Sequence, residues 1–290
     1  MGRWRLSGMV LALATGVAGS SAALTREPVS LSPSEPWRVN YADDSCLMMR
    51  GFGQDKDKVA VRFEQTAPGQ RFSLTLVGRS LDAGEPFTRA ATTFLPVGKR
   101  AAHERVGSGT ATDSKLPLLI FSSVFLLGPV EKVEDIETYD WTQAGAIESL
   151  LIEFRGKSLL LKLGRMEKVL AAMDACTDEL LTHWGLDAAA QRTLRQLPKP
   201  LSNPGTWLRG ADYPSEALAK GRSAIVRFRL TIDATGTVLG CAIPSATQGP
   251  EFAKITCSGI SKRARFDPAL DKDGKPVASY FVSTVTWVNS

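Results

Sequence analysis

Short runs in which hydrophobic and polar residues alternate fill residues 24–164 of the sequence. Turn-forming residues, for example at 67–69 and 155–157, separate the runs. A period of two is typical of half-buried strands, and many short strands with frequent turns favour an antiparallel sandwich or barrel. The expected strands cover residues 37–41, 58–63, 71–77, 92–95, 118–127, 150–154 and 158–163, and the last two form the clearest hairpin.

A helical pattern follows over residues 165–184. Hydrophobic positions recur there at steps of three and four, which predicts one buried stripe. The stripe contains Val169, Met173, Cys176, Leu180 and Leu181. Gly185 is suited to end the helix because glycine adopts the left-handed conformation common after a helix C-terminus. We therefore expect residues 23–195 to form a β-rich domain that ends in a helix.

Residues 196–212 carry three prolines and several polar residues, so they are interpreted as a linker, tightest over 197–210. A second domain, residues 213–290, opens with a short helix at 215–220. Residues 223–233 then alternate, with Val226, Phe228, Leu230 and Ile232 on one face and Arg227, Arg229 and Thr231 on the other.

The rest of the second domain is expected to contain a second strand, a helix and a last strand. The turn 233–236 leads to a partner strand at 237–243. A helix is expected at 251–265 and a long last strand at 277–288. The helix should bury Ala253, Cys257, Ile260 and Ala264. The predicted fold class is α+β: a sandwich- or barrel-like domain with a C-terminal helix, then a small αββαβ domain.

The N-terminus has the layout of a secretory signal. Arg3 and Arg5 precede an apolar stretch at 9–19, which the small residues Ser20-Ser21-Ala22 follow. The apolar stretch is shorter than the roughly 20 residues of a membrane-spanning helix. We expect residues 1–22 to be a cleaved signal peptide and the protein to be exported; an uncleaved anchor is the alternative.

Composition narrows the function classes. With 43% hydrophobic and 22% charged residues the chain is expected to be globular. The 35 Lys and Arg against 30 Asp and Glu are spread along the chain, so no nucleic-acid partner is expected. The two histidines, His103 and His183, leave few groups for imidazole catalysis. No catalytic elbow, zinc-protease or phosphate-loop motif is present, so we expect neither an enzyme nor a cofactor or metal.

Four cysteines, Cys46, Cys176, Cys241 and Cys257, are an even number for an exported protein and are expected to form disulfides. Sequence allows three pairings. Because the linker separates the two halves, we favour Cys46 with Cys176 and Cys241 with Cys257, each bridge within one domain.

Three further motifs have structural interpretations. Residues 51–53 lack the third glycine of a dinucleotide loop and are predicted to be a turn. Residues 271–274 imitate part of a calcium loop without its final glutamate, so a turn is also expected there. The basic run 262–265 is interpreted as the solvated face of a helix.

The C-terminal domain resembles the C-terminal domain of TonB-type energy transducers. The resemblance covers about residues 210–290 and rests on Tyr213-Pro214, the turn 233–236, Gly240-Cys241, the Cys257 helix, the run 263–269 and the closing 285–288. It implies a periplasmic domain that binds an extended segment of an outer-membrane TonB-dependent receptor at a sheet edge. An exposed edge offers unpaired N–H and C=O groups for that purpose.

By this resemblance the peptide-binding residues are Tyr213, Pro214, Ser279, Tyr280, Phe281, Val282, Ser283, Thr284 and Val285, although each could instead serve the core. Cys241 and Cys257 would staple the hairpin to the helix. The interpretation requires that the outer edge of the last strand be free.

Other functions remain open from the sequence. If the leader is retained, inner-membrane motor proteins become partners and the protein could transduce energy. A cleaved product could bind a receptor without pulling on it. The alternatives are a non-transducing periplasmic scaffold, a protein that binds peptidoglycan through its cationic helix, or a hydrolase in the N-terminal domain.

Overall fold

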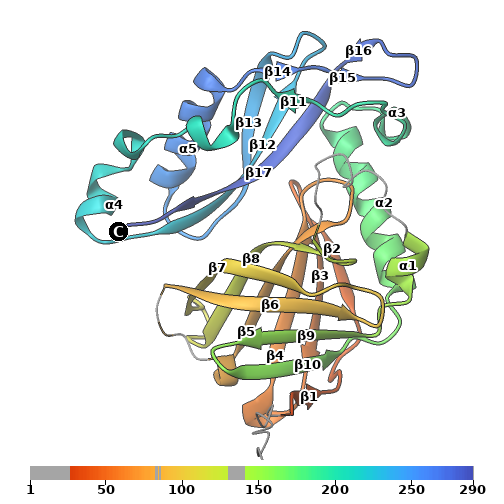
Figure 1. The fold of residues 1–290 in the computed structure, drawn as a ribbon, viewed down its shortest axis with the longest axis vertical. Helices are drawn as coiled ribbons and strands as arrows, with labels where there is room; N and C mark the ends of the chain where they lie inside the picture. The colour runs from red at the N-terminus through yellow and green to blue at the C-terminus, as the bar shows by residue number, and fades with distance from the viewer. Residues whose placement is uncertain (1–26, 82–83, 85, 130–140, 290) are drawn as a thin grey trace, which may run out of the picture.

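The computed structural model describes residues 27–81, 84, 86–129 and 141–289. It is a mixed α+β structure with many strands and few helices, as predicted. The expected signal peptide, residues 1–22, lies outside the described residues. None of the helices within the described ranges is long and apolar enough to cross a membrane. Figure 1 shows a β-barrel below a smaller domain, with helix α2 beside both.

The first domain is a ten-stranded sheet with the order β1-β10-β9-β6-β7-β8-β5-β4-β3-β2. Its strands are β1 Val29–Leu31, β2 Arg38–Tyr41, β3 Cys46–Phe52, β4 Val59–Gln65, β5 Arg71–Gly78, β6 Phe87–Leu95, β7 Ala101–Thr110, β8 Pro117–Phe125, β9 Ser149–Phe154 and β10 Lys157–Lys162.

The sheet closes on itself just after β1. The N–H of Ser34 donates to the carbonyl of Gly51 (2.9 Å), and that of Gly53 donates to Ser32 (2.8 Å). The segment that follows β1 is therefore bonded to β3, while β1 itself pairs with β10. Alternate residues point inward, so bulky side chains such as Phe63 and Phe94 fill the interior.

The sequence located most of this barrel but not all of it. The hairpin β9–β10 is confirmed, and its turn uses positive φ angles at Arg155 (47°) and Gly156 (69°). Strands β1, β3 and β7 lie outside the predicted strand ranges; in β7, polar residues and two glycines hide the alternation. The turn predicted at 51–53 is wrong in part: Gly51 and Phe52 end β3, and the chain bends at Gly53 (φ 70°).

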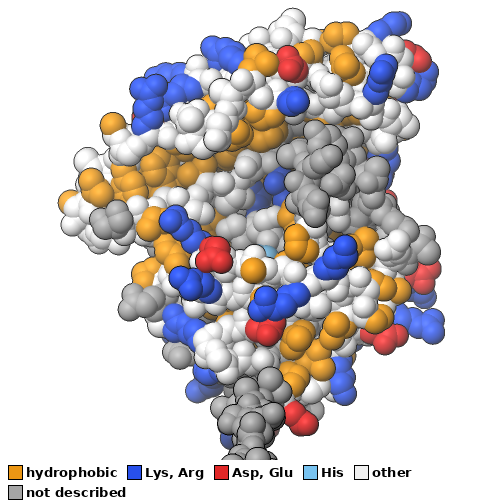
Figure 2. Space-filling model, in the orientation of Figure 1, with side chains coloured by type: hydrophobic (Ala, Val, Ile, Leu, Met, Phe, Trp, Pro, Cys, Tyr) orange, Lys and Arg blue, Asp and Glu red, His pale blue; other side chains and the backbone are white. Residues whose placement is uncertain are grey.

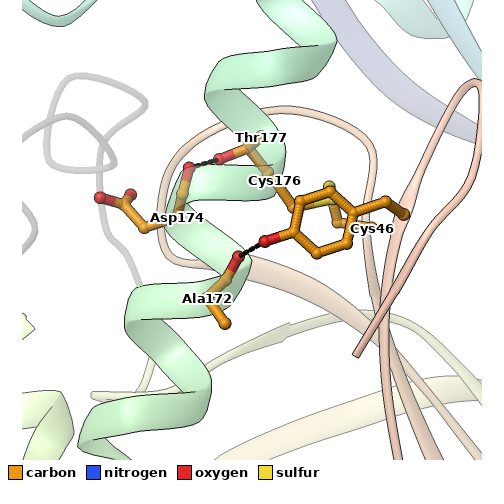
Figure 3. Close-up of a disulfide and its surroundings, with 6 residues drawn as sticks. Cys46, Ala172, Asp174, Cys176 and Thr177 are labelled. Atoms are coloured by element: carbon orange, nitrogen blue, oxygen red, sulfur yellow. Dashed lines mark hydrogen bonds between the residues drawn. A yellow bond between two sulfur atoms is a disulfide. The ribbon is translucent and has the colours of Figure 1, made fainter. Parts of the chain in front are cut away.

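Helix α2, Glu167–His183, has the predicted stripe buried against the barrel. Gly185 follows with a φ of 77°. Cys176 on this helix is bonded to Cys46 on β3, as expected (Figure 3). Two hydrogen bonds flank the bridge, from the Tyr41 hydroxyl to the Ala172 carbonyl (3.1 Å) and from the Thr177 hydroxyl to Asp174 (2.9 Å). Two short helices were not predicted: α1 Trp141–Gly145 and α3 Ala188–Arg192.

The second domain has the expected order of main elements. These are α4 Ser215–Ala219, β12 Ala224–Ile232, β13 Val238–Ala246, α5 Pro250–Arg263 and β17 Ser279–Trp287. The three strands form a sheet in the order β13-β12-β17, with α5 on one face. The predicted stripe of α5 is shifted: Phe252, Thr256 and Gly259 are buried beside Ile260, and Cys257 is half-buried in its bridge to Cys241.

The linker region is bonded to the second domain. Strand β11, Lys199–Pro200, pairs with β14, Phe266–Asp267. The N–H of Arg195 donates to Leu270 (2.8 Å), next to the small hairpin of β15 Ala269–Leu270 and β16 Pro276–Val277, whose turn lies at 271–274 as predicted. Residues 195–201 are thus hydrogen-bonded to the second domain, although the sequence predicts most of them to be a linker.

Candidate functional site

The sheet of the second domain has two different faces. Strand β12 turns Phe228, Leu230 and Ile232 toward α5, where they are buried with Trp207 and Ile260. This face is the apolar one that the sequence predicted. The opposite face carries the arginines of β12, and it lies over the barrel (Figure 1).

Arg227 is buried between the two domains. Its guanidinium donates to the Ser73 hydroxyl (2.7 Å) and the Ser122 carbonyl (2.8 Å), and it lies 3.7 Å from the Glu64 carboxylate. Burial lowers the pKa of Arg227 to about 10, and Glu64 opposes that shift. The sequence predicted only that this residue lies on the second face of the strand; the covering of that face by the barrel was not foreseen.

Arg229 ties the same face to the end of α2. Its guanidinium donates to Asp44 (2.9 Å) and stacks over the Trp184 ring at 3.9 Å. Trp184 also contacts the Tyr280 ring edge-on, with 5.6 Å between centroids. Because guanidinium and aromatic groups attract each other at this distance, the contact adds to the domain interface.

The first half of β17 is held by the protein itself. Arg71, at the start of β5, donates to the carbonyl of Val282 (2.6 Å). The Ser279 hydroxyl donates to Gln191 on α3 (2.6 Å), and the Gln191 amide donates to the Ala278 carbonyl (3.0 Å). Residues 278–282 therefore contact α3, α2 and the barrel.

The pairing of β17 with β12 fixes which groups point outward. The register is unbroken from Ser279 to Trp287, and the main-chain groups of an antiparallel strand alternate in direction. Since the Val282 carbonyl is available to Arg71, its direction is away from β12. The N–H and C=O groups of Thr284 and Thr286 then share that direction.

The second half of β17 borders a groove of about 490 Å³. One wall is residues 283–288, which are the end of β17 and the residue after it, and the other wall is the segment 204–213. Arg105 of β7 reaches the groove from the barrel. Figure 2 shows a hollow between the domains, with a band of hydrophobic side chains along its upper border and Lys or Arg side chains on the barrel side. We call the groove between residues 283–288 and the segment 204–213 the edge groove.

The wall 204–213 is fixed by a half-buried ion pair and a buried ring. Trp207 is 2% exposed and packs against Phe266 and Phe281. Arg263 donates to the Trp207 carbonyl (2.6 Å) and to both oxygens of Asp212 (2.6 and 2.9 Å), which lowers the pKa of Asp212 to about 2. The basic run of α5 is therefore not wholly a solvated face, because Arg263 is engaged in holding this wall.

The predicted site residues fall into three positions. Tyr213 lines the edge groove, while its hydroxyl donates to the Arg222 carbonyl (2.6 Å) and its ring packs on Phe252 and Trp287. Pro214 precedes α4. Of the strand residues, Ser283, Thr284 and Val285 line the groove, whereas Ser279, Tyr280 and Val282 contact α3, Trp184 and Arg71. Phe281 is half-buried and packs against the core.

Two parts of the groove were missed from the sequence. Trp207 lies near three prolines, in the region that the sequence predicts to be a linker, although a tryptophan in such a segment is a signal of packing. Arg105 lies on the unpredicted strand β7, and no local pattern indicated that it would face another domain.

The second domain is a three-stranded sheet with a helix on one face, and part of its edge strand borders open space. Residues 209–288 match the family model of the Gram-negative bacterial TonB protein C-terminal. Domains of this family are non-enzymatic, are associated with the Gram-negative envelope and interact with outer-membrane TonB-dependent receptors. The chain is matched over that segment, and no curated protein matches it.

Proposed function

We propose that this protein binds an extended segment of an outer-membrane TonB-dependent receptor by adding it as a fourth strand to the outer edge of β17. The observation that supports this best is the edge groove, which leaves residues 283–288 beside open space. Strand addition gives affinity through main-chain hydrogen bonds and selectivity through the neighbouring side chains.

The protein's own contacts limit the length of the guest strand. Arg71 holds the Val282 carbonyl, so pairing begins after that residue. Six residues, 283–288, remain along the groove, and at about 3.3 Å per residue they span roughly 20 Å. The predicted site of residues 279–285 is thereby narrowed in this proposal to its second part and extended toward Val288.

A proline substitution tests the main-chain part of the proposal. Thr284→Pro removes an outward N–H and leaves the inward groups that pair with β12, so the domain should stay folded. Synthetic peptides that tile the N-terminal segments of TonB-dependent receptors are titrated into the full chain, and binding is measured by fluorescence anisotropy. We expect at least one peptide to bind and Thr284→Pro to weaken it about tenfold or more.

Thr284→Val is the matched control, because it keeps the N–H and changes the side chain almost isosterically. It should bind like the unchanged protein. If every peptide fails against folded protein, or if the proline variant binds as well as the control, strand addition at β17 is wrong.

We further propose that the protein is exported to the periplasm through residues 1–22. The support is the sequence layout described above. N-terminal sequencing of the protein from cells decides between a start at Ala23, which makes it a binding protein without its own anchor, and retention of the leader, which favours coupling to inner-membrane motor proteins.

A further inference from the structure

We propose that Arg105 of the barrel is a specificity-determining residue of the edge groove and selects guest strands that carry a carboxylate. This inference rests on the proposed strand addition and names the chemistry of the guest. It also assigns a role to the N-terminal domain, which contributes Arg105 to the lining of the binding site.

The charge of the groove supports this choice of guest. Among the described residues that line it, Arg105 and Arg209 are the charged ones, and neither Asp nor Glu is present. The nearest acidic groups along the chain are already paired, Glu104 with Arg89 (3.3 Å) and Asp212 with Arg263 (2.6 Å). An extended peptide with an Asp or Glu side chain therefore enters a positive field.

Arg105 is available for such a contact. It is exposed, and no ion pair of its guanidinium is found within the described part of the chain. On β7 its neighbour Val106 points into the barrel core, so Arg105 points outward, on the side that meets the second domain. The next outward residue, Gly107, lies against Ile225 of β12.

The domain interface gives Arg105 a defined position relative to β17. Arg227 and Arg229 bond to the barrel side from the strand next to β17. Gly107 adds a close approach: a Cβ built there would be 2.8 Å from the Cδ1 atom of Ile225. A charge held across a groove discriminates between guests better than one on a flexible segment, because less freedom is lost on binding.

A peptide scan tests the inference on the full chain. The probes are seven-residue Thr/Val peptides with blocked ends, in which a single Glu replaces each position in turn, and matched peptides with Gln at the same position. We expect the unchanged protein to prefer Glu over Gln about fivefold at one position or two adjacent ones. The preference should shrink at high salt, since partly exposed charges are screened.

Arg105→Gln should remove most of that preference while leaving the affinity for the Gln peptides unchanged. Lys162→Gln, which removes an exposed cation on β10, is the control and should keep the preference. Arg209→Gln should reduce the preference less, because Arg209 already interacts with Asp212.

The outcomes separate the two proposals. If Glu and Gln peptides bind equally to the unchanged protein, or if Arg105→Gln keeps the preference, the role of Arg105 is wrong and strand addition stands. If no peptide of either series binds and the receptor peptides also fail, strand addition is wrong and the selectivity inference is overturned with it.

Discussion

The two domains of this protein differ in the edges of their sheets: the sheet of the barrel is closed, whereas that of the second domain has an open edge at β17. In the barrel, the chain after β1 bonds to β3, so the two ends of the sheet meet. In the second domain, β17 stays at the edge, and Arg71 holds its Val282 carbonyl while residues 283–288 border a groove. Exposed edges invite unwanted pairing, and proteins commonly close or cover them. In the proposed strand addition, the second domain accepts the guest strand, and the barrel limits how much of the β17 edge is offered to it.

Each domain has one disulfide, and the two should differ in their effect on stability. The barrel bridge joins residues 130 apart, whereas Cys241 and Cys257 are 16 apart. In the chain-entropy model the longer loop is worth about 5 kcal/mol and the shorter about 3 kcal/mol. We expect Cys46→Ala/Cys176→Ala to lower the free energy of unfolding more than Cys241→Ala/Cys257→Ala, as measured by urea denaturation. Equal losses, or the reverse order, would contradict the comparison.

Substitution of Arg227, which is buried between the two domains, tests whether the domains unfold as one unit. Arg227→Ala removes a buried charge from Glu64, Ser73 and Ser122, and breaking such a network costs about 3 kcal/mol. Calorimetry should then show the second domain melting separately from the barrel. Arg227→Met fills the same space without a charge and should cost less. An unchanged melting profile for Arg227→Ala would mean that the interface adds little.

A smaller effect is expected where Gly107 of the barrel lies against the side chain of Ile225 on β12. Gly107→Ala places a methyl group 2.8 Å from the Cδ1 atom of Ile225, and overpacking of this kind costs about 1–2 kcal/mol. Ile225→Val deletes that Cδ1 atom, so the double variant should recover most of the loss. If the stability losses of the two single variants add up in the double variant, as measured by thermal unfolding, the contact between residues 107 and 225 is not the cause of the loss in Gly107→Ala.

The local patterns of the sequence predicted much of the fold. The alternation of β12, the stripe of α2 and the hairpin β9–β10 each depend on neighbours in sequence, and all are present. The pairing of the cysteines also followed from the domain division. Strand β7 was not predicted, because few of its residues point inward and its glycines weaken the alternation of hydrophobic and polar positions.

The site was less predictable because it is made by contacts between distant segments. Arg71 and Val282 are 211 residues apart in sequence, and nothing near either residue indicates that they meet. The polar face of β12 resembled any solvated face, since an arginine facing water and one facing a second domain have the same spacing. The resemblance indicated the last strand, but it could not show that the barrel contacts the first half of that strand through Arg71.

The smallest predicted effect concerns the wall of the edge groove opposite β17. Arg263 lowers the pKa of Asp212 to about 2, below the value of about 3.9 for an unfolded chain. The pair therefore stabilises the fold fully above about pH 4, and this contribution is lost as the pH falls through 2. Because the Asp212 carboxylate also accepts from the N–H of Arg209 (2.8 Å), its protonation should loosen residues 209–213. Peptide affinity measured between pH 5 and pH 2 should fall slightly in the unchanged protein relative to Asp212→Asn, which lacks the titrating group. Parallel pH profiles for the two proteins would show that this pair does not shape the groove.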